Sequence, residues 1–134
     1  MEKTYHGSCH CGAVAFEATL DLQAGTGKCN CSYCSKTRAW GLLIKPDAFT
    51  VVSPVDRSIE YRFGSMSNAH KICGICGVHT HSEGNIEQMG GAFVAVQVSA
   101  LDDVSVAELT QAPVTFQNGR ENAWWEQPTS TSYL

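Results

Sequence analysis

The chain has 134 residues, of which 43% are hydrophobic and 16% are charged, and nine Lys and Arg against thirteen Asp and Glu give a formal net charge of -4. This length fits a single domain over residues 1–134 with a core of its own. No apolar run has the length of a membrane span, and no basic block could follow a phosphate backbone, so we expect neither a membrane nor a nucleic-acid partner. Residues 1–10 lack the charged and then apolar pattern of a secretory signal, which predicts a cytoplasmic protein.

Short segments rich in β-branched and aromatic residues recur along the chain and predict strands. In residues 13–20, Val14, Phe16 and Leu20 alternate with smaller or polar residues, and residues 58–63 repeat this alternation. Further segments of this kind, bounded by Gly, Pro, Asn or Asp, are residues 40–44, 49–52, 92–100 and 114–117. The pattern predicts a mainly β domain of small antiparallel sheets.

One helical signal occurs late in the chain. Ser105 and Glu108 have the spacing of a capping box, and Pro113 limits the helix that follows. We therefore expect at most one or two short helical turns. After the turn dipeptide Asn118-Gly119, we expect Trp124 and Trp125 to anchor the β core, with a role as ligand platforms as the alternative.

The seven cysteines indicate metal binding rather than disulfides. Their number is odd, and the cysteines within residues 9–11 and within residues 29–31 are too close in sequence to bridge easily. In a reducing cytosol, grouped thiols favour a metal site.

Four cysteines form two pairs that suit one closed zinc site. Cys73 and Cys76, followed by Gly77, have the spacing of a zinc knuckle, which normally finds a second ligand pair elsewhere in the chain. Cys9 and Cys11 supply that pair, because residues two apart on an extended segment face the same way. We expect a structural zinc ion that clamps two distant segments and stabilises a small β domain.

The remaining cysteines, Cys29, Cys31 and Cys34, have no obvious fourth partner. This matches the rule that catalytic zinc keeps one coordination position open for water or substrate. Two alternatives remain. In one, the triplet shares an ion with one member of a cysteine pair. In the other, a histidine closes the triplet into a structural site, and the candidates are His70, His79 and His81.

Four stretches of the chain resemble the glutathione-dependent formaldehyde-activating enzymes, a family that also includes centromere protein V. They are GSCHCGAVAFEA (7–18), CNCSYC (29–34), CGICGV (73–78) and the looser NGRENAWW (118–125). The resemblance implies the Mss4-like fold, in which small β-sheets surround zinc. It also implies two Zn²⁺ ions per chain: a structural ion on Cys9, Cys11, Cys73 and Cys76, and an active-site ion on Cys29, Cys31 and Cys34.

The resemblance further implies a carbon-sulfur lyase, similar to S-hydroxymethylglutathione synthase, that acts on glutathione and formaldehyde. Three thiolates on a divalent ion leave a formal charge of about -1, which makes a soft site suited to thiol chemistry. We expect an incoming thiol to take the open position and add to a small aldehyde. Lys28, Lys36 and Arg38 lie near the triplet in sequence, and we expect Lys36 and Arg38 to bind the thiol's carboxylates, with a solvated surface as the alternative.

A competing hypothesis is a non-catalytic zinc scaffold or thiol-binding module. The fourth position at the triplet distinguishes the two classes. A protein ligand there favours a scaffold, and an exchangeable ligand favours an enzyme.

Overall fold

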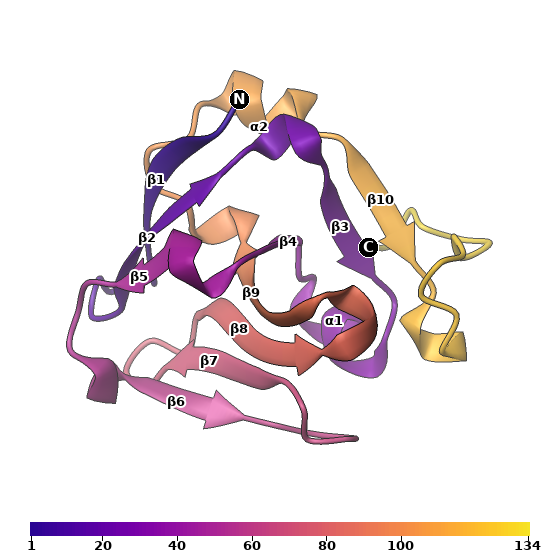
Figure 1. Ribbon diagram of the computed structural model, residues 1–134, viewed down its shortest axis with the longest axis horizontal. Helices are drawn as coiled ribbons and strands as arrows, with labels where there is room; N and C mark the ends of the chain where they lie inside the picture. The colour runs from indigo at the N-terminus through magenta and orange to yellow at the C-terminus, as the bar shows by residue number, and fades with distance from the viewer.

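The computed structural model describes residues 1–134 and consists mainly of two β-sheets (Figure 1). The smaller sheet is antiparallel, in the order β1 (Lys3–Ser8), β2 (Ala15–Leu20) and β5 (Phe49–Val51). The larger sheet has the order β10-β3-β4-β9-β8-β7-β6, and only its β10–β3 pair is parallel. Its strands are β3 (Thr26–Cys29), β4 (Gly41–Ile44), β6 (Ser58–Tyr61), β7 (Ala69–Cys73), β8 (His79–Ile86), β9 (Gly91–Gln97) and β10 (Val114–Gln117). The predicted mainly β fold is confirmed.

Helices are short, as predicted. They are α1 (Ser32–Thr37) and α2 (Val106–Gln111), with 3-10 turns η1 (Leu22–Ala24), η2 (Pro46–Ala48), η3 (Val55–Arg57), η4 (Glu87–Met89), η5 (Val98–Ala100) and η6 (Gly119–Glu121). None of these helices has both the length and the apolar character needed to cross a bilayer. The predicted capping box begins α2, because Glu108 N donates to Ser105 Oγ (3.1 Å) and Ser105 N donates to Glu108 Oε2 (2.7 Å).

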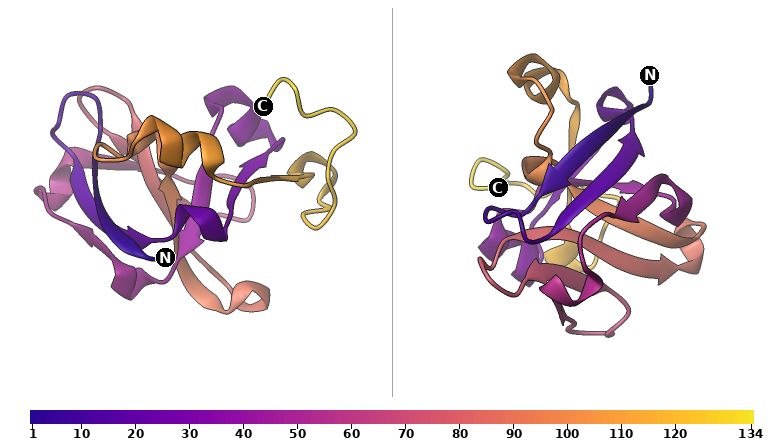
Figure 2. Two further views of the ribbon diagram at one scale, coloured as in Figure 1. Left: turned by 90° about the horizontal axis from the view of Figure 1, so that it is seen from above. Right: turned by 90° about the vertical axis from the view of Figure 1, so that its left-hand side faces the viewer.

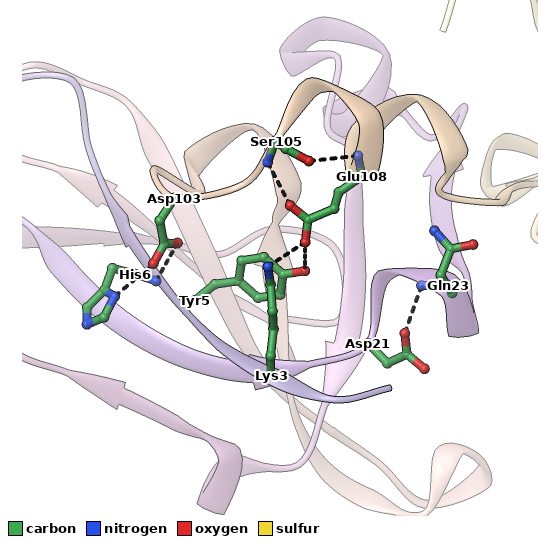
Figure 3. Close-up of polar contacts among 8 residues, drawn as sticks. All are labelled: Lys3, Tyr5, His6, Asp21, Gln23, Asp103, Ser105 and Glu108. Carbon is green, nitrogen blue, oxygen red and sulfur yellow. Dashed lines mark hydrogen bonds and ion pairs between the residues drawn. The ribbon is translucent and has the colours of Figure 1, made fainter.

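Helix α2 is fastened to strand β1 by polar contacts, although the two lie a hundred residues apart (Figure 3). Tyr5 Oη donates to Glu108 Oε1 at 2.6 Å, and Lys3 Nζ lies 2.7 Å from the same oxygen. These partners lower the pKa of Glu108 to about 2, with Lys3 contributing most. Beside them, His6 N donates to Asp103 Oδ1 at 2.9 Å, so the smaller sheet is held to the segment that follows β9.

Both sheets contribute to the larger hydrophobic core. On β2, Phe16 and Leu20 are almost completely buried, as their alternation predicted, and they belong to the same cluster as Val96 and Val98. The Phe16 ring also covers Gly7 on the neighbouring strand, where an added Cβ would lie 2.2 Å from a ring carbon. The core therefore holds the two sheets together.

Strands β1, β3, β7 and β8 and helix α1 lie outside the segments predicted as regular structure. Helix α1 has only six residues, too few to show a helical period, and it carries no buried residue. Strands β3 and β7 contain polar residues and lack apolar alternation, so their strand conformation comes from pairing with neighbouring strands. Tertiary pairing, not local propensity, defines these strands.

Candidate metal centres and the adjoining cleft

Four cysteines from two distant turns converge at one point. Cys9 and Cys11 lie in the turn between β1 and β2, whereas Cys73 ends β7 and Cys76 lies in the turn before β8. Their sulfur atoms all lie within 4.8 Å of one another, and Cys11 Sγ is 3.7 Å from the sulfurs of both Cys9 and Cys73. The four-cysteine cluster therefore consists of the two pairs predicted from sequence.

The backbone around the four-cysteine cluster is shaped to support sulfur ligands. Gly12 (φ 83°) and Gly77 (φ 80°) both adopt the left-handed conformation that lets each turn close behind its cysteines. Val14 N donates to Cys9 Sγ at 3.3 Å, and Cys76 N donates to Cys73 Sγ at 3.4 Å. Such backbone hydrogen bonds lower the pKa of the Cys73 thiol and so favour the thiolate, which is the form that binds metal.

The other three cysteines gather at the start of α1. Cys29 ends β3, Cys31 is the N-cap of α1, and Cys34 lies within α1, with all three sulfurs within 4.8 Å of one another. Cys31 N donates to Cys29 Sγ at 3.3 Å, and Cys34 N donates to Cys31 Sγ at 3.3 Å. The three-cysteine cluster thus forms within a single local turn.

The charges of the three sulfurs are strongly interdependent. Hydrogen bonds with Cys29 and Cys34 lower the pKa of the Cys31 thiol to about 2, whereas hydrogen bonds with Cys29 and Cys31 raise the pKa of Cys34. Three thiolates at this separation repel one another, and a divalent cation would remove that repulsion. Both clusters could hold a metal ion, and their all-sulfur donor sets suit zinc.

No histidine nitrogen lies within 4.8 Å of all three sulfurs of the three-cysteine cluster. The three candidate histidines are hydrogen-bonded elsewhere: His70 Nδ1 to Ser82 Oγ, His79 Nε2 to the His81 carbonyl, and His81 Nδ1 to Thr80 Oγ1, each at 2.9 Å. The three-cysteine cluster therefore stands without a fourth protein ligand among them.

A cleft of about 550 Å³ opens beside the three-cysteine cluster. Its walls come from Cys31 and Ser32 at the start of α1, from loop 63–68 and His70, and from segment 119–124. Trp124 lines this cleft and is 49% exposed, and Trp125 is 81% exposed, so the expectation that both anchor the β core is wrong. Strand β10 runs parallel to β3, with Gln117 opposite Cys29, and segment 119–124 follows β10 directly (Figure 1).

Asn30, between the first two cysteines of the cluster, joins it to the cleft wall. Asn30 Nδ2 donates to Asn118 Oδ1 at 2.9 Å, and Asn30 Oδ1 accepts from Arg120 N at 2.9 Å. Between them, Gly119 packs so closely that an added Cβ would lie 2.6 Å from Cys29 Sγ. From sequence, residues 118–120 showed a turn signal and part of a family-like stretch, but neither predicted this support of the cluster.

Arg120 is the only cationic side chain in the cleft lining. Its Nε donates to the Asn30 carbonyl at 3.1 Å and its Nη2 to Ser35 Oγ at 3.2 Å, which fixes the guanidinium beside α1. A positioned guanidinium of this kind suits a carboxylate ligand.

The cationic residues singled out from sequence lie away from the cleft lining. Lys36 and Arg38 are exposed on and after α1, and Arg38 Nη1 donates to the Tyr133 carbonyl. Lys28 Nζ lies 5.5 Å from the centre of the Trp40 ring and 3.4 Å from the Leu134 carbonyl oxygen. These contacts place the C-terminus beside α1 (Figure 2). A role for Lys36 and Arg38 in substrate binding stays a prediction.

Comparison with known proteins agrees with the fold and identifies the family. A sequence profile described as glutathione-dependent formaldehyde-activating enzyme matches residues 4–120. A crystal structure of a Rhodobacter sphaeroides protein is similar to this chain, with 30% sequence identity, a TM-score of 0.69, and coverage of 82% of this chain and 99% of that one. The chain therefore belongs to the glutathione-dependent formaldehyde-activating enzyme family.

Proposed function

We propose that this protein is a zinc-dependent carbon-sulfur lyase that forms or breaks the adduct of a glutathione-like thiol with a small aldehyde such as formaldehyde. The observation that carries this proposal is the cleft of about 550 Å³ that opens onto Cys31 of a three-cysteine cluster. A closed structural zinc site needs no cleft, whereas a reactive site needs access for substrate. The family to which the chain belongs suggests the two substrates.

The proposal assigns two Zn²⁺ ions per chain. Cys9, Cys11, Cys73 and Cys76 would hold the structural ion, and the three-cysteine cluster would hold the ion at the active site. When bound there, zinc supplies a coordination position that captures the substrate thiol as its thiolate.

The side chains of the cleft have separate tasks in this proposal. Arg120 attracts a carboxylate of the thiol substrate, and Phe63 and Trp124 provide apolar walls that partly exclude water. In the forward direction the thiolate sulfur attacks the aldehyde carbon and a carbon-sulfur bond forms. The π electrons of the carbonyl move to its oxygen, which takes a proton from water to complete the hydroxyl of the adduct.

Cobalt substitution tests the proposal directly. Added glutathione should strengthen the sulfur-to-cobalt absorption band of the protein, because it supplies one more thiolate to an incomplete site. The Cys31→Ser variant controls for the four-cysteine cluster and should not respond. The protein should also consume glutathione and formaldehyde faster than buffer alone. An unchanged spectrum together with no rate enhancement would favour the zinc scaffold.

A further inference from the structure

His70 is the only histidine in the cleft lining. It lies on β7, and its ring stacks on Tyr33 of α1, with ring centres 4.2 Å apart, and on Phe63, with centres 5.4 Å apart. This packing fixes the plane of the imidazole beside the three-cysteine cluster. Three hydrogen-bond contacts on the β8 side of the ring decide which of its nitrogens carries the proton.

The first of these bonds determines the tautomer of His79. His79 Nε2 lies 2.9 Å from the carbonyl oxygen of His81, and because a carbonyl only accepts, Nε2 must carry a proton. His79 Nδ1 is fully buried and has no partner, which is tolerable for an unprotonated nitrogen but costly for an N–H group. Burial also lowers the pKa of His79 to about 4, so the ring is neutral at physiological pH.

The other two contacts, both made by the Ser82 hydroxyl, pass this constraint to His70. Ser82 Oγ lies 2.9 Å from His79 Nε2 and 2.9 Å from His70 Nδ1. Since His79 Nε2 is a donor, His70 Nδ1 is the one contact that can accept the proton of the buried Ser82 hydroxyl, and a buried hydroxyl proton without an acceptor is costly. His70 Nδ1 is therefore an acceptor, and a neutral His70 carries its proton on Nε2.

The protonated nitrogen of His70 has no partner within the protein and keeps some contact with solvent, although the residue as a whole is only 9% exposed. His70 Nε2 makes no hydrogen bond within the protein, yet it is not among the fully buried side-chain atoms without a partner, which are Asn68 Oδ1 and His79 Nδ1. His70 lines the cleft together with Cys31. An N–H group with no internal partner, next to the cysteine cluster, is positioned to meet a ligand.

We propose that His70 is a catalytic residue, a neutral imidazole whose Nε2–H donates a hydrogen bond to the carbonyl oxygen of the aldehyde. The inference rests on the proposed function and adds a role that the cysteines cannot fill. As the sulfur attacks, negative charge develops on that oxygen, and a pre-oriented donor in a cleft stabilises it. The hydrogen bonds through Ser82 to His79 keep the donor on the correct nitrogen, and the proton for the product hydroxyl still comes from water.

Nitrogen NMR of the histidine side chains in the zinc-loaded protein, without substrates, tests the first half of the inference. The His70 resonances should show the Nε2–H tautomer, with Nδ1 accepting a hydrogen bond. In Ser82→Ala, the Nδ1 resonance should move to the position of an imine nitrogen that lacks this bond. A wild-type His70 protonated on Nδ1 would overturn the inference whatever the activity.

Kinetics test the second half. His70→Phe keeps a flat ring against Tyr33 but removes the donor, and it should lower kcat by about 100-fold, as expected when one donor to a developing oxyanion is lost. His70→Gln, whose amide N–H lies near the position of Nε2, should recover part of this loss. Glutathione titration of the cobalt-loaded variants should show unchanged thiol binding, which separates a role in the reaction from a structural one.

The two proposals fail in different ways. A wild-type protein that does not accelerate the reaction of glutathione with formaldehyde contradicts the proposed function, and the substrate role of His70 falls with it. An active wild type with a His70→Phe variant active to within about threefold contradicts the His70 inference alone, because loss of an oxyanion donor costs more than this.

Discussion

The two cysteine clusters use the same ligand atom in opposite settings. In the four-cysteine cluster, Cys9 follows a strand of the smaller sheet and Cys73 ends a strand of the larger one. These two cysteines are 3% and 1% exposed, with the buried Val14 packed beside them, whereas Cys11 is exposed and Cys76 is half-buried. In the three-cysteine cluster, all the sulfurs come from residues 29–34, all three cysteines are half-buried, and Cys31 lines a cleft. The comparison teaches that topology separates a clamp from a reactive site, because the first must join distant segments and the second must remain accessible.

The clusters also differ in where their supporting residues come from. Two left-handed glycines and backbone N–H groups support the four-cysteine cluster, so its own turns complete it. The three-cysteine cluster depends on Asn30 and on residues 118–120, which come from the far end of the chain. Because residues 118–120 are remote in sequence from the cysteines, a substitution in them can disturb the three-cysteine cluster without unfolding the protein.

Loss of a cysteine from each cluster should produce the largest contrast. Cys73→Ser should unfold or aggregate the protein, because it breaks a clamp between two sheets and leaves the metal ion with three thiolate ligands instead of four. Cys31→Ser should leave most of the fold intact and remove one metal ion. Thermal melts and metal analysis of both variants measure the difference. Equal losses of thermal stability would show that the two clusters do not differ in structural role.

Chelator treatment should separate the two metal ions in the wild-type protein. The ion at the three-cysteine cluster should leave at least about ten times faster, because its open position admits a competing ligand, whereas four thiolates enclose the other ion. Metal released against time, with Cys31→Ser as the matched control, gives both rates. Two ions that leave together, or one ion in fully loaded protein, would contradict the division into four and three.

Gly119→Ala should disturb the three-cysteine cluster from outside it. The added Cβ would lie 2.6 Å from Cys29 Sγ and 2.5 Å from the Trp124 ring, so segment 119–124 must shift, at a cost of about 1–3 kcal/mol of stability. Gly74→Ala, at the other cluster, is the matched control, because its Cβ would meet nothing closer than 3.3 Å. Metal retention should fall at the three-cysteine cluster in Gly119→Ala. Undiminished retention there would show that segment 119–124 does not support the cluster.

Arg120→Met should have the smallest effect of these substitutions. It tests whether the cleft beside the three-cysteine cluster binds the thiol substrate. We expect the KM for glutathione to rise about 10-fold, the scale of one lost hydrogen bond to a charged group, with little change for a thiol that has no carboxylate, such as 2-mercaptoethanol. A double variant of Lys36 and Arg38 to Met tests the residues expected from sequence. If KM rises equally for both thiols in Arg120→Met, the arginine positions Asn30 rather than substrate.

The amino-acid sequence alone determined the strands with regular alternation, the α2 cap and the grouping of the cysteines. Phe16 and Leu20 on β2, and Val14 just before it, are buried as predicted, because alternation along an extended segment is a local property. The cysteine groups are also local. Cys73 and Cys76 share one turn, and the three cysteines of residues 29–34 share another, so their spacing is sufficient to bring their sulfurs together. Only the meeting of the two pairs required an assumption about tertiary structure, and a metal's demand for four ligands supplied it.

Tertiary structure alone decided the cleft and the orientation of its groups. Loop 63–68 lies at the edge of the larger sheet, while segment 119–124 is brought in by the parallel pairing of β10 with β3, and no periodic pattern links the two segments. For the same reason, the cation in the lining is Arg120 rather than a residue next to the cysteines, since α1 ends in a left-handed turn at Arg38 (φ 57°) and the Arg38 side chain contacts Tyr133. The tautomer of His70 depends on hydrogen bonds between β7 and β8, and such bonds exist only once the strands have paired in register.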